Sequence, residues 1–310
     1  MHYLSMIFFQ VVAPILVLLV LGGALQKRFQ FNVKALSSLV TFCLMPAAVF
    51  LNIYETSIQA AVLGKIIVYL FAFSLTLMLI SNLLVKVLRL KGAPAAVFKN
   101  SIVLINSGNY GLPVSQMVFA TQPIGTAIQI ITIVFQNLTT YTYGLYNLIA
   151  TSKSGFAIIR DIVKLPIVHA LVLGIILNVL DVPLPMFIDI PLTHLAEAFI
   201  AIALLTLGAQ LSKIKLKTLL NKMLYLSCIG RLLLGPLVAM LFIYVFRFDG
   251  VVAQSLLMAS AFPTSRNSAS LALEYDVEPD LAAQTVLVTT IVSCITVTMV
   301  IYVSRILYPV

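Results

Sequence analysis

Long apolar runs separated by short polar connectors cover almost the whole chain. Ten runs can be marked between clusters of Gly, Pro, Asn or charged residues, each close to the roughly 20 residues that a helix needs to cross a bilayer core. The predicted helices are Ile7–Leu25, Leu36–Tyr54, Ile66–Leu88, Pro94–Ala120, Ile124–Ala150, Val163–Leu180, Ile190–Leu211, Met223–Phe246, Val251–Tyr275 and Leu281–Leu307. The pattern therefore predicts an all-α integral membrane protein with ten transmembrane helices.

Composition supports the same class. Hydrophobic residues make up 61% of the 310 residues and charged residues only 9%, whereas a soluble domain has roughly 25% charged residues. The three cysteines, Cys43, Cys228 and Cys294, all lie in apolar runs, so they predict neither a disulfide framework nor a metal site. The net charge of +9 is spread over short connectors without interleaved aromatics, so no nucleic-acid partner is expected.

The positive charges predict an orientation. If the N-terminus is outside, fourteen Lys and Arg residues fall in connectors on the cytoplasmic side, and only Lys65, Arg247 and Arg305 fall outside. The positive-inside rule then places both termini outside the cell membrane. The connector between the ninth and tenth helices is the exception, because it carries acidic residues only, and acidic residues count little in this rule.

Two spacings recur in the same order in each half of the chain: a proline eight residues before a glycine, and a glycine seventeen residues before an asparagine. They join Pro14 to Gly22 and Gly92 to Asn109, and then Pro166 to Gly174 and Gly250 to Asn267. We expect a first five-helix repeat at 1–150, a short cytoplasmic linker at 151–162 and a second five-helix repeat at 163–310. Because five is an odd number, the second repeat would enter the membrane inverted.

The fourth and ninth predicted helices each contain a helix-breaking segment midway along an apolar run, at Asn106–Pro113 and Ala261–Ser268. Freed backbone groups in hydrocarbon cost several kcal/mol each, so such breaks must be enclosed by protein or face water. Two breaks at matching places of inverted halves would cross near the bilayer centre and form a site for a solute or ion. The alternative is that Gly and Pro only kink two packed helices.

The segment Asn-Ser-Gly-Asn-Tyr-Gly-Leu-Pro at Asn106–Pro113 resembles the helix-4 signature of the auxin efflux carrier family. Pro263–Asn267 with the following Ser-Ala-Ser, and Thr289–Ser293 in the tenth helix, are similar to further segments of that family. The family includes plant auxin exporters and bacterial carriers of malate, malonate and related organic acids. Plant exporters have a long cytosolic region between their halves, so the short linker at 151–162 favours a microbial organic acid permease over an auxin carrier.

The resemblance implies a transport domain that moves against a scaffold and holds its substrate where the broken helices cross. Carried over by position, it assigns substrate binding to Asn106, Asn109, Pro113, Pro263 and Asn267. The proline follows its asparagine in the first break and precedes it in the second, so the two breaks need not share one geometry.

Arg266 is the strongest candidate from residue chemistry alone. A cation at mid-membrane costs about 2.5–3.5 kcal/mol on insertion scales, and a bound carboxylate would offset that cost. The neighbouring Ser107, Thr264 and Ser265 complete the candidate substrate site. The alternative is a structural ion pair of Arg266 with Glu197 or Glu274.

Other polar residues have two interpretations each. Glu197 is either a proton-coupling carboxylate or an interfacial residue. Arg231, near the start of the eighth helix, is expected to extend to the inner surface. Gln136 and Asn137 in the fifth helix could contact a solute or a neighbouring helix.

Enzyme, ATPase and metal-site motifs are absent from the sequence, so we expect no enzyme, no metal and no cofactor apart from coupling to H⁺ or Na⁺. The predicted function is secondary active or facilitative transport of a small organic anion, a mono- or dicarboxylate such as malate, by alternating access across the cytoplasmic membrane. An anion channel, or an ion-coupled carrier of another solute class, stays an alternative. The expected partners are the anion, the lipid bilayer and a second copy of the chain in a homodimer.

Overall fold

The computed structural model describes residue 9 and residues 13–56, 60–148, 166–214 and 222–310. Within these ranges the fold is all-helical, and the only strand-like pairing is an isolated bridge between Ile105 and Thr264. The predicted linker at 151–162 and both predicted repeat boundaries lie outside the described residues.

The helices of the first half are α2 (Ala13–Phe29), α3 (Val33–Leu39), η2 (Val40–Leu44), α4 (Met45–Glu55), α5 (Ala60–Val87), α6 (Gly92–Val103), η3 (Ser107–Gly111), α7 (Leu112–Val118), α8 (Pro123–Thr139), η4 (Thr140–Gly144) and α9 (Leu145–Leu148). Those of the second half are α11 (Pro166–Val179), α12 (Met186–Leu211), α13 (Lys222–Ile229), η5 (Gly230–Leu234), α14 (Gly235–Phe246), α15 (Gly250–Ser260), α16 (Arg266–Glu274) and α17 (Pro279–Leu307). The described parts of the predicted segments are mainly helical, and the fourth and ninth segments are interrupted by non-helical backbone at 104–106 and 261–265.

Five of these stretches are long and apolar enough to cross a membrane, judged by length and composition: Val33–Glu55, Val62–Val87, Met186–Leu211, Lys222–Phe246 and Pro279–Leu307. The structure therefore has the character of a multi-pass membrane protein. The count of ten spans and the inverted repeat stay predictions.

Four wide π-helical turns, η2 to η5, interrupt runs that the sequence pattern predicted as continuous or simply broken helices. In three of them a proline follows two residues after the turn, at Pro46, Pro113 and Pro236. Proline lacks the amide hydrogen of a regular helical bond and clashes with the preceding turn, so the backbone widens just before it. These turns change which way the side chains before each proline point.

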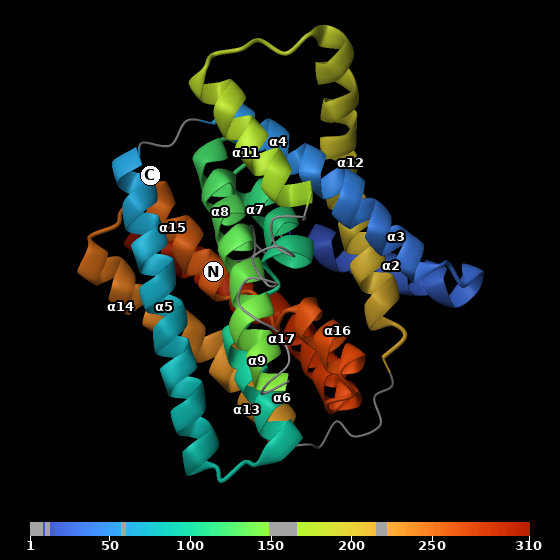
Figure 1. Cartoon of the computed structure of the whole chain (residues 1–310), viewed down its shortest axis with the longest axis vertical. Helices are drawn as coiled ribbons and strands as arrows, with labels where there is room; N and C mark the ends of the chain where they lie inside the picture. Colours follow the sequence, from blue (N-terminus) through green and yellow to red (C-terminus); the bar gives the residue numbers. More distant parts are fainter. Residues whose placement is uncertain (1–8, 10–12, 57–59, 149–165, 215–221) are drawn as a thin grey trace.

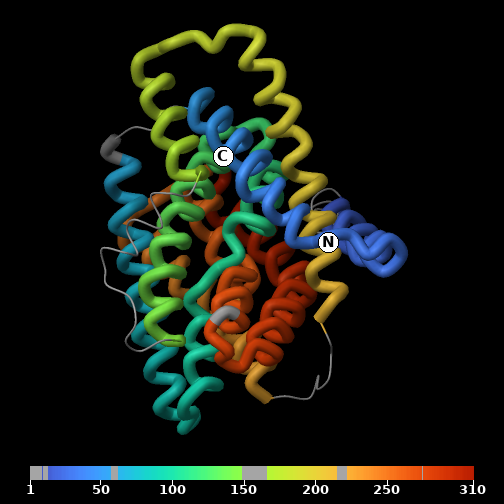
Figure 2. Tube along the Cα trace, turned by 45° about the vertical axis from the view of Figure 1, so that its right-hand side comes forward, coloured from blue at the N-terminus to red at the C-terminus, as the bar shows by residue number. Residues whose placement is uncertain are grey.

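The helices pack as two groups (Figures 1 and 2). A flank group contains α2, α3, η2, α4, α11 and α12, and a core group contains α5 to α9 and α13 to α17 with their π turns. In the flank group α12 packs on α2 and on α4, and α11 packs on α4. The two groups meet where α12 contacts η3 and α7, and where α4 contacts α8.

Two glycines bring α2 and α12 close together. A Cβ atom on Gly22 would lie 2.1 Å from the carbonyl oxygen of Leu205, and one on Gly208 would lie 2.0 Å from that of Leu19. Small residues at such a crossing let two membrane helices approach backbone to backbone. This contact joins the first and seventh predicted helices within the flank group.

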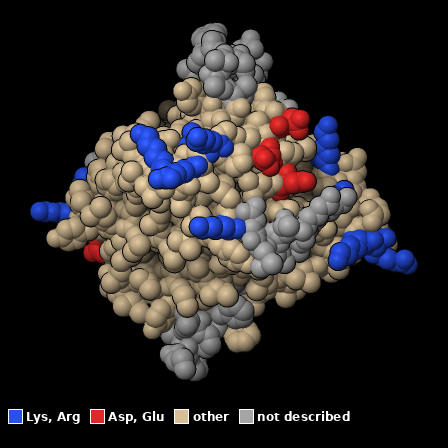
Figure 3. Space-filling model, turned by 90° about the horizontal axis from the view of Figure 1, so that it is seen from below, with Lys and Arg blue, Asp and Glu red and all other residues tan. Residues whose placement is uncertain are grey.

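The charged side chains lie mostly near the ends of the helices. The face of the molecule seen from below carries several Lys and Arg side chains, a group of acidic side chains on one side and further acidic atoms at the opposite edge (Figure 3). The α5–α6 connector lies at this end of the molecule (Figure 1).

Candidate functional site

The two predicted breaks cross each other in the core group. The amide nitrogen of Asn106 donates to the carbonyl oxygen of Pro263 over 2.9 Å, and the amide nitrogen of Ser265 donates to that of Leu104 over 2.8 Å. These bonds flank the antiparallel bridge between Ile105 and Thr264. The structure therefore confirms both breaks, and each break supplies hydrogen bonds to the other.

Side chains of α8 and of the second break satisfy further backbone carbonyls near the crossing. Gln129 and Gln136 of α8 donate to the carbonyls of Ser107 and Val103, over 2.9 and 3.3 Å. The Thr264 hydroxyl donates to the carbonyl of Ser101 over 2.8 Å. A buried carbonyl without a partner would destabilise the fold, so these bonds make unwound backbone tolerable at membrane depth.

Four helical segments have one end at this crossing. Along the chain, α6 and α15 end there, whereas η3 with α7, and α16, begin there. Helix C-termini carry a partial negative charge and N-termini a partial positive charge. The crossing thus has a C-terminal pole, formed by the ends of α6 and α15, and an N-terminal pole, which includes the first turn of α16.

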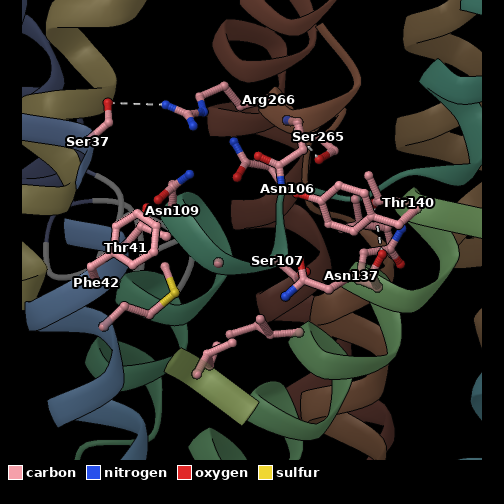
Figure 4. Close-up of a pocket in the computed structure, with 18 of the residues that line it drawn as sticks. Ser37, Thr41, Phe42, Asn106, Ser107, Asn109, Asn137, Thr140, Ser265 and Arg266 are labelled. Carbon is pink, nitrogen blue, oxygen red and sulfur yellow. Dashed lines mark hydrogen bonds between the residues drawn. The ribbon is translucent and has the colours of Figure 1, made fainter. Parts of the chain in front are cut away.

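A cavity of about 290 Å³ lies at the N-terminal pole, between the core group and the flank group (Figure 4). The core group lines it with the breaks and the end of α8, and the flank group with α3, η2 and the start of α11. Its polar and charged lining residues are Lys34, Ser37, Ser38, Thr41, Asn106, Ser107, Asn109, Gln136, Asn137, Thr140, Tyr141, Ser265, Arg266 and Asn267.

Two hydrogen-bond donors of this lining have no partner within the described residues. The Nδ2 atom of Asn106 has none, although the residue is only 3% exposed, and neither has the Nε atom of Arg266. Buried donors are nearly always hydrogen-bonded, so two donors without partners beside a cavity need an explanation. A ligand with acceptor oxygens in the cavity would provide it.

Arg266 lies at one rim of the cavity. Its Nη1 atom donates to the Ser37 hydroxyl over 3.3 Å (Figure 4). Gln210 donates to the same hydroxyl over 2.6 Å. A second cavity of about 870 Å³ lies on the other side of this contact, and Lys34, Ser37 and Arg266 line both. Arg266 and Ser37 therefore stand between an open vestibule and the smaller cavity.

Six of the nine predicted substrate-binding residues line the cavity: Asn106, Ser107, Asn109, Ser265, Arg266 and Asn267. The three others are buried apart from its lining. Pro113 packs in the first turn of α7, while Pro263 and Thr264 take part in the crossing through their backbone and hydroxyl groups. The two prolines do occupy different geometries, one in a helix and one in the extended break.

Glu197 lies away from the cavity. Its side chain is 71% exposed on α12, and its carboxylate is 3.7 Å from the imidazole of His194. Within the described residues Arg266 forms no ion pair with it, and the side chain of Glu274 lies outside the described part. A role of Glu197 in proton coupling stays a prediction without support from its position.

The expectation for Arg231 is wrong. Its side chain is fully buried, at 0% exposure, and does not extend to a surface. It donates to the backbone carbonyls of Ile102 and Ser260 at the C-terminal pole of the crossing. The π turn η5 at Gly230–Leu234, ahead of Pro236, redirects this part of the eighth predicted helix toward the core.

Sequence reasoning missed the contribution of the second predicted helix. Lys34, Ser37 and Thr41 follow one another at intervals of three and four residues, which places them on one helix face. That polar stripe in an apolar span was a readable signal. Thr140 and Tyr141, by contrast, line the cavity because they belong to η4, and no local sequence pattern predicts that turn.

Comparison with known proteins agrees with this architecture. Residues 150–301 match the model of a family described as membrane transport protein. An uncharacterized transporter of Methanocaldococcus jannaschii is 27% identical over 301 residues, which cover 92% of this chain and 96% of that protein. An uncharacterized transporter of Methanothermobacter thermautotrophicus is 27% identical over 195 residues, 62% of each chain.

Proposed function

Because residues 150–301 match a family of membrane transport proteins and the two relatives are named as transporters, we propose that the chain carries a small organic anion across the cytoplasmic membrane, through the cavity at the crossing. A mono- or dicarboxylate such as malate is the proposed substrate class. The proposed mechanism is alternating access, in which the core group and the flank group expose the cavity to one side of the membrane at a time.

The charge of the cavity lining carries this proposal. Lys34 and Arg266 are its charged lining residues, and no Asp or Glu belongs to the lining within the described part of the chain. The unpaired donors of Asn106 and Arg266 add hydrogen-bonding capacity without a matching acceptor. A guanidinium pairs with a carboxylate through two parallel hydrogen bonds, which makes an organic acid the best-matched ligand.

The first turn of α16 adds to this attraction. The Ser265 side chain caps the helix by accepting from the amide of Asn267 over 3.2 Å, and Arg266 is the first residue of the nine-residue helix. A helix N-terminus favours negative charge. Its dipole thus acts in the same direction as the guanidinium.

The size of the cavity favours a small solute. At about 290 Å³ it lies just below the roughly 300–1,000 Å³ that is usual for small-molecule sites. A short dicarboxylate suits this space better than a bulky aromatic acid. The vestibule of about 870 Å³ would admit the solute in hydrated form.

The pairing of helices supports the inverted repeat as part of the proposal. In the flank group the first predicted helix packs on the seventh, as α2 on α12, and the second packs on the sixth, as α4 on α11. An inverted repeat relates the first helix to the sixth and the second to the seventh, so exchanging the two halves turns the first–seventh contact into the sixth–second contact. A two-fold axis in the membrane plane would give this pairing and would relate the two breaks.

The proposed topology has both termini outside, because fourteen Lys and Arg residues then fall in cytoplasmic connectors and three outside. The vestibule, with Lys34 and Lys213 on its walls, would open toward the cytoplasm. Coupling to H⁺ or Na⁺ and assembly as a homodimer remain part of the proposal without a residue assigned to either.

Uptake into proteoliposomes tests the function. We expect labelled malate or a related acid to enter vesicles that contain the wild-type protein, and to enter faster when unlabelled acid is trapped inside. A carrier shows this counterflow and a simple pore does not. Arg266→Ala should abolish uptake, whereas Arg28→Ala, which removes an exposed arginine at the end of α2, should not. Equal uptake by both variants would contradict the proposed site.

A further inference from the structure

Arg231 occupies the C-terminal pole of the crossing. It is the largest side chain among those buried to less than 2% exposure, and it belongs to η5, between α13 and α14. It does not line the proposed substrate cavity. A buried guanidinium at membrane depth is costly, so its position needs a compensating interaction.

The compensation comes from two backbone carbonyls. Nη1 of Arg231 donates to the carbonyl oxygen of Ile102 over 2.6 Å, and Nη2 donates to that of Ser260. Ile102 lies in the last turn of α6, and Ser260 is the last residue of α15. One side chain therefore joins the ends of the two half-helices that terminate at the crossing.

The charges at this pole balance. Each helix C-terminus corresponds to roughly half of a negative elementary charge, so the two ends together correspond to about one. The guanidinium brings one positive charge, and within the described residues no carboxylate lies within ion-pair distance of it. The negative charge that stabilises Arg231 is thus that of the half-helix ends themselves.

A glycine makes room for this arrangement. A Cβ atom on Gly235 would lie 2.5 Å from Nη2 of Arg231 and 2.6 Å from the carbonyl oxygen of Ser260. Any side chain at that position would push the guanidinium away from α15. The place of Arg231 is therefore built by two helices and a glycine, and it is not an incidental contact.

In transporters with broken helices, C-terminal half-helix ends and unwound carbonyls are the groups that coordinate a transported cation. We propose that Arg231 is a positioning residue that acts as a permanent internal cation at this pole, in the place that an exchangeable cation would otherwise take. It fixes the ends of α6 and α15 and so holds the breaks in the geometry that forms the substrate cavity. The uptake measurements rest on the proposed function, whereas the measurements of Tm do not.

Three variants separate the effect of the positive charge of Arg231 from the effect of the shape of its side chain. Arg231→Lys keeps the positive charge, Arg231→Gln keeps a hydrogen-bond donor without the charge, and Arg231→Ala leaves a space of the right shape for free guanidinium. Arg28→Ala serves as the control for unspecific effects of guanidinium, because Arg28 is exposed.

We expect Arg231→Ala to lower the Tm by several degrees, and millimolar guanidinium chloride to restore part of that loss relative to N-methylglucamine chloride of equal ionic strength. The same addition should leave the Tm of the wild-type and Arg28→Ala proteins unchanged. In proteoliposomes Arg231→Lys should retain at least threefold more malate uptake than Arg231→Gln, and guanidinium should restore part of the uptake of Arg231→Ala.

The proposal is overturned if Arg231→Gln has the Tm and uptake of the wild-type protein, or if the Lys and Gln variants lose uptake by the same factor. It is also overturned if a folded Arg231→Ala protein does not respond to guanidinium. If Arg231→Ala does not fold, the comparison of Arg231→Lys with Arg231→Gln tests the proposal without it. Because the Tm measurement needs no substrate, it still decides the role of Arg231 if wild-type protein transports none of the acids tested.

Discussion

The two poles of the crossing each carry an arginine, and their surroundings differ. Arg231 at the C-terminal pole is fully buried, and two backbone carbonyls hold it. Arg266 at the N-terminal pole is half-buried, donates to the Ser37 hydroxyl and has a free Nε atom beside the cavity. Within the described residues the Nε atom is unpaired in both arginines, but two carbonyls of the fold hold the Nη atoms of Arg231, whereas Arg266 lies on the lining of a cavity.

This difference teaches how a charged residue at membrane depth can be interpreted. A cation that neutralises helix ends needs no further ligand, because the negative partial charges lie where the helices stop. A cation at the start of a helix faces a positive partial charge and is stabilised only by an anion or by solvent. This difference supports the proposed structural role of Arg231 and the proposed binding role of Arg266.

The largest expected effect comes from adding a negative charge to the N-terminal pole. Asn106→Asp keeps the side-chain shape and replaces the unpaired Nδ2 donor with a carboxylate oxygen. Placing like charges together costs several kcal/mol, so we expect affinity for a dicarboxylate to fall by about a hundredfold or more. The apparent Kd from thermal shifts measures this.

Asn32→Asp is the matched control for that change, since Asn32 caps α3 by accepting from the amide of Ala35, and an aspartate can do the same. A wild-type affinity in Asn106→Asp would remove Asn106 from the binding site.

A smaller but still large effect is expected at the C-terminal pole from Gly235→Ala. The added methyl group clashes with the guanidinium of Arg231 and with Ser260, and overpacking of this kind typically costs about 1–3 kcal/mol. The Tm should fall and uptake should fall with it. Gly64→Ala on α5 is the control, because nothing lies within 4 Å of its Cβ position. If both variants had the same Tm, the close packing of Gly235 against Arg231 would be disproved.

Lys34→Ala should have a moderate effect on the N-terminal pole. Lys34 lines both the cavity and the vestibule but is exposed, so its attraction for an anion is screened by salt. We expect the apparent KM for uptake to rise by up to about fivefold at low ionic strength and less at high salt. Lys65→Ala, an exposed lysine of α5 that lines neither space, should leave the KM unchanged. A change in KM that is the same at low and high ionic strength would argue against an electrostatic role of Lys34.

Glu197→Gln should have the smallest effect. The carboxylate is exposed beside His194 and outside the cavity lining. We expect the uptake rate to change by less than about twofold at any pH between 5 and 8, since removing an exposed charge is a weak perturbation. A large loss together with a changed pH dependence would restore the role in proton coupling that the sequence suggested.

The segment boundaries and the two breaks could be predicted from the sequence because their signals are local. Apolar length defines a span, and Gly, Pro and Asn in the middle of a span define a break. The crossing followed from the matching positions of Asn109 and Asn267, which both line the cavity.

The position of Arg231 could not be predicted in this way. An arginine nine residues into an apolar helix ordinarily extends to the surface, and only the π turn before Pro236 and the ends of α6 and α15 direct it inward. The contribution of Thr140 and Tyr141 depends in the same way on a turn set by tertiary contacts. Pro113, Pro263 and Thr264 were assigned to binding because they share a motif with other lining residues, whereas the structure places Pro113 in the first turn of α7 and uses Pro263 and Thr264 in the crossing.

The most direct test of the account is the thermal stability of purified protein in the presence of a dicarboxylate such as malate. A ligand that binds only the folded state stabilises it by about 2.7 kcal/mol at a hundred times its Kd, which is a measurable rise in Tm. The account predicts this rise for the wild-type and Arg28→Ala proteins, a smaller rise for Arg266→Lys and none for Arg266→Ala. An equal rise in Arg266→Ala would show that the anion binds elsewhere and would contradict the account.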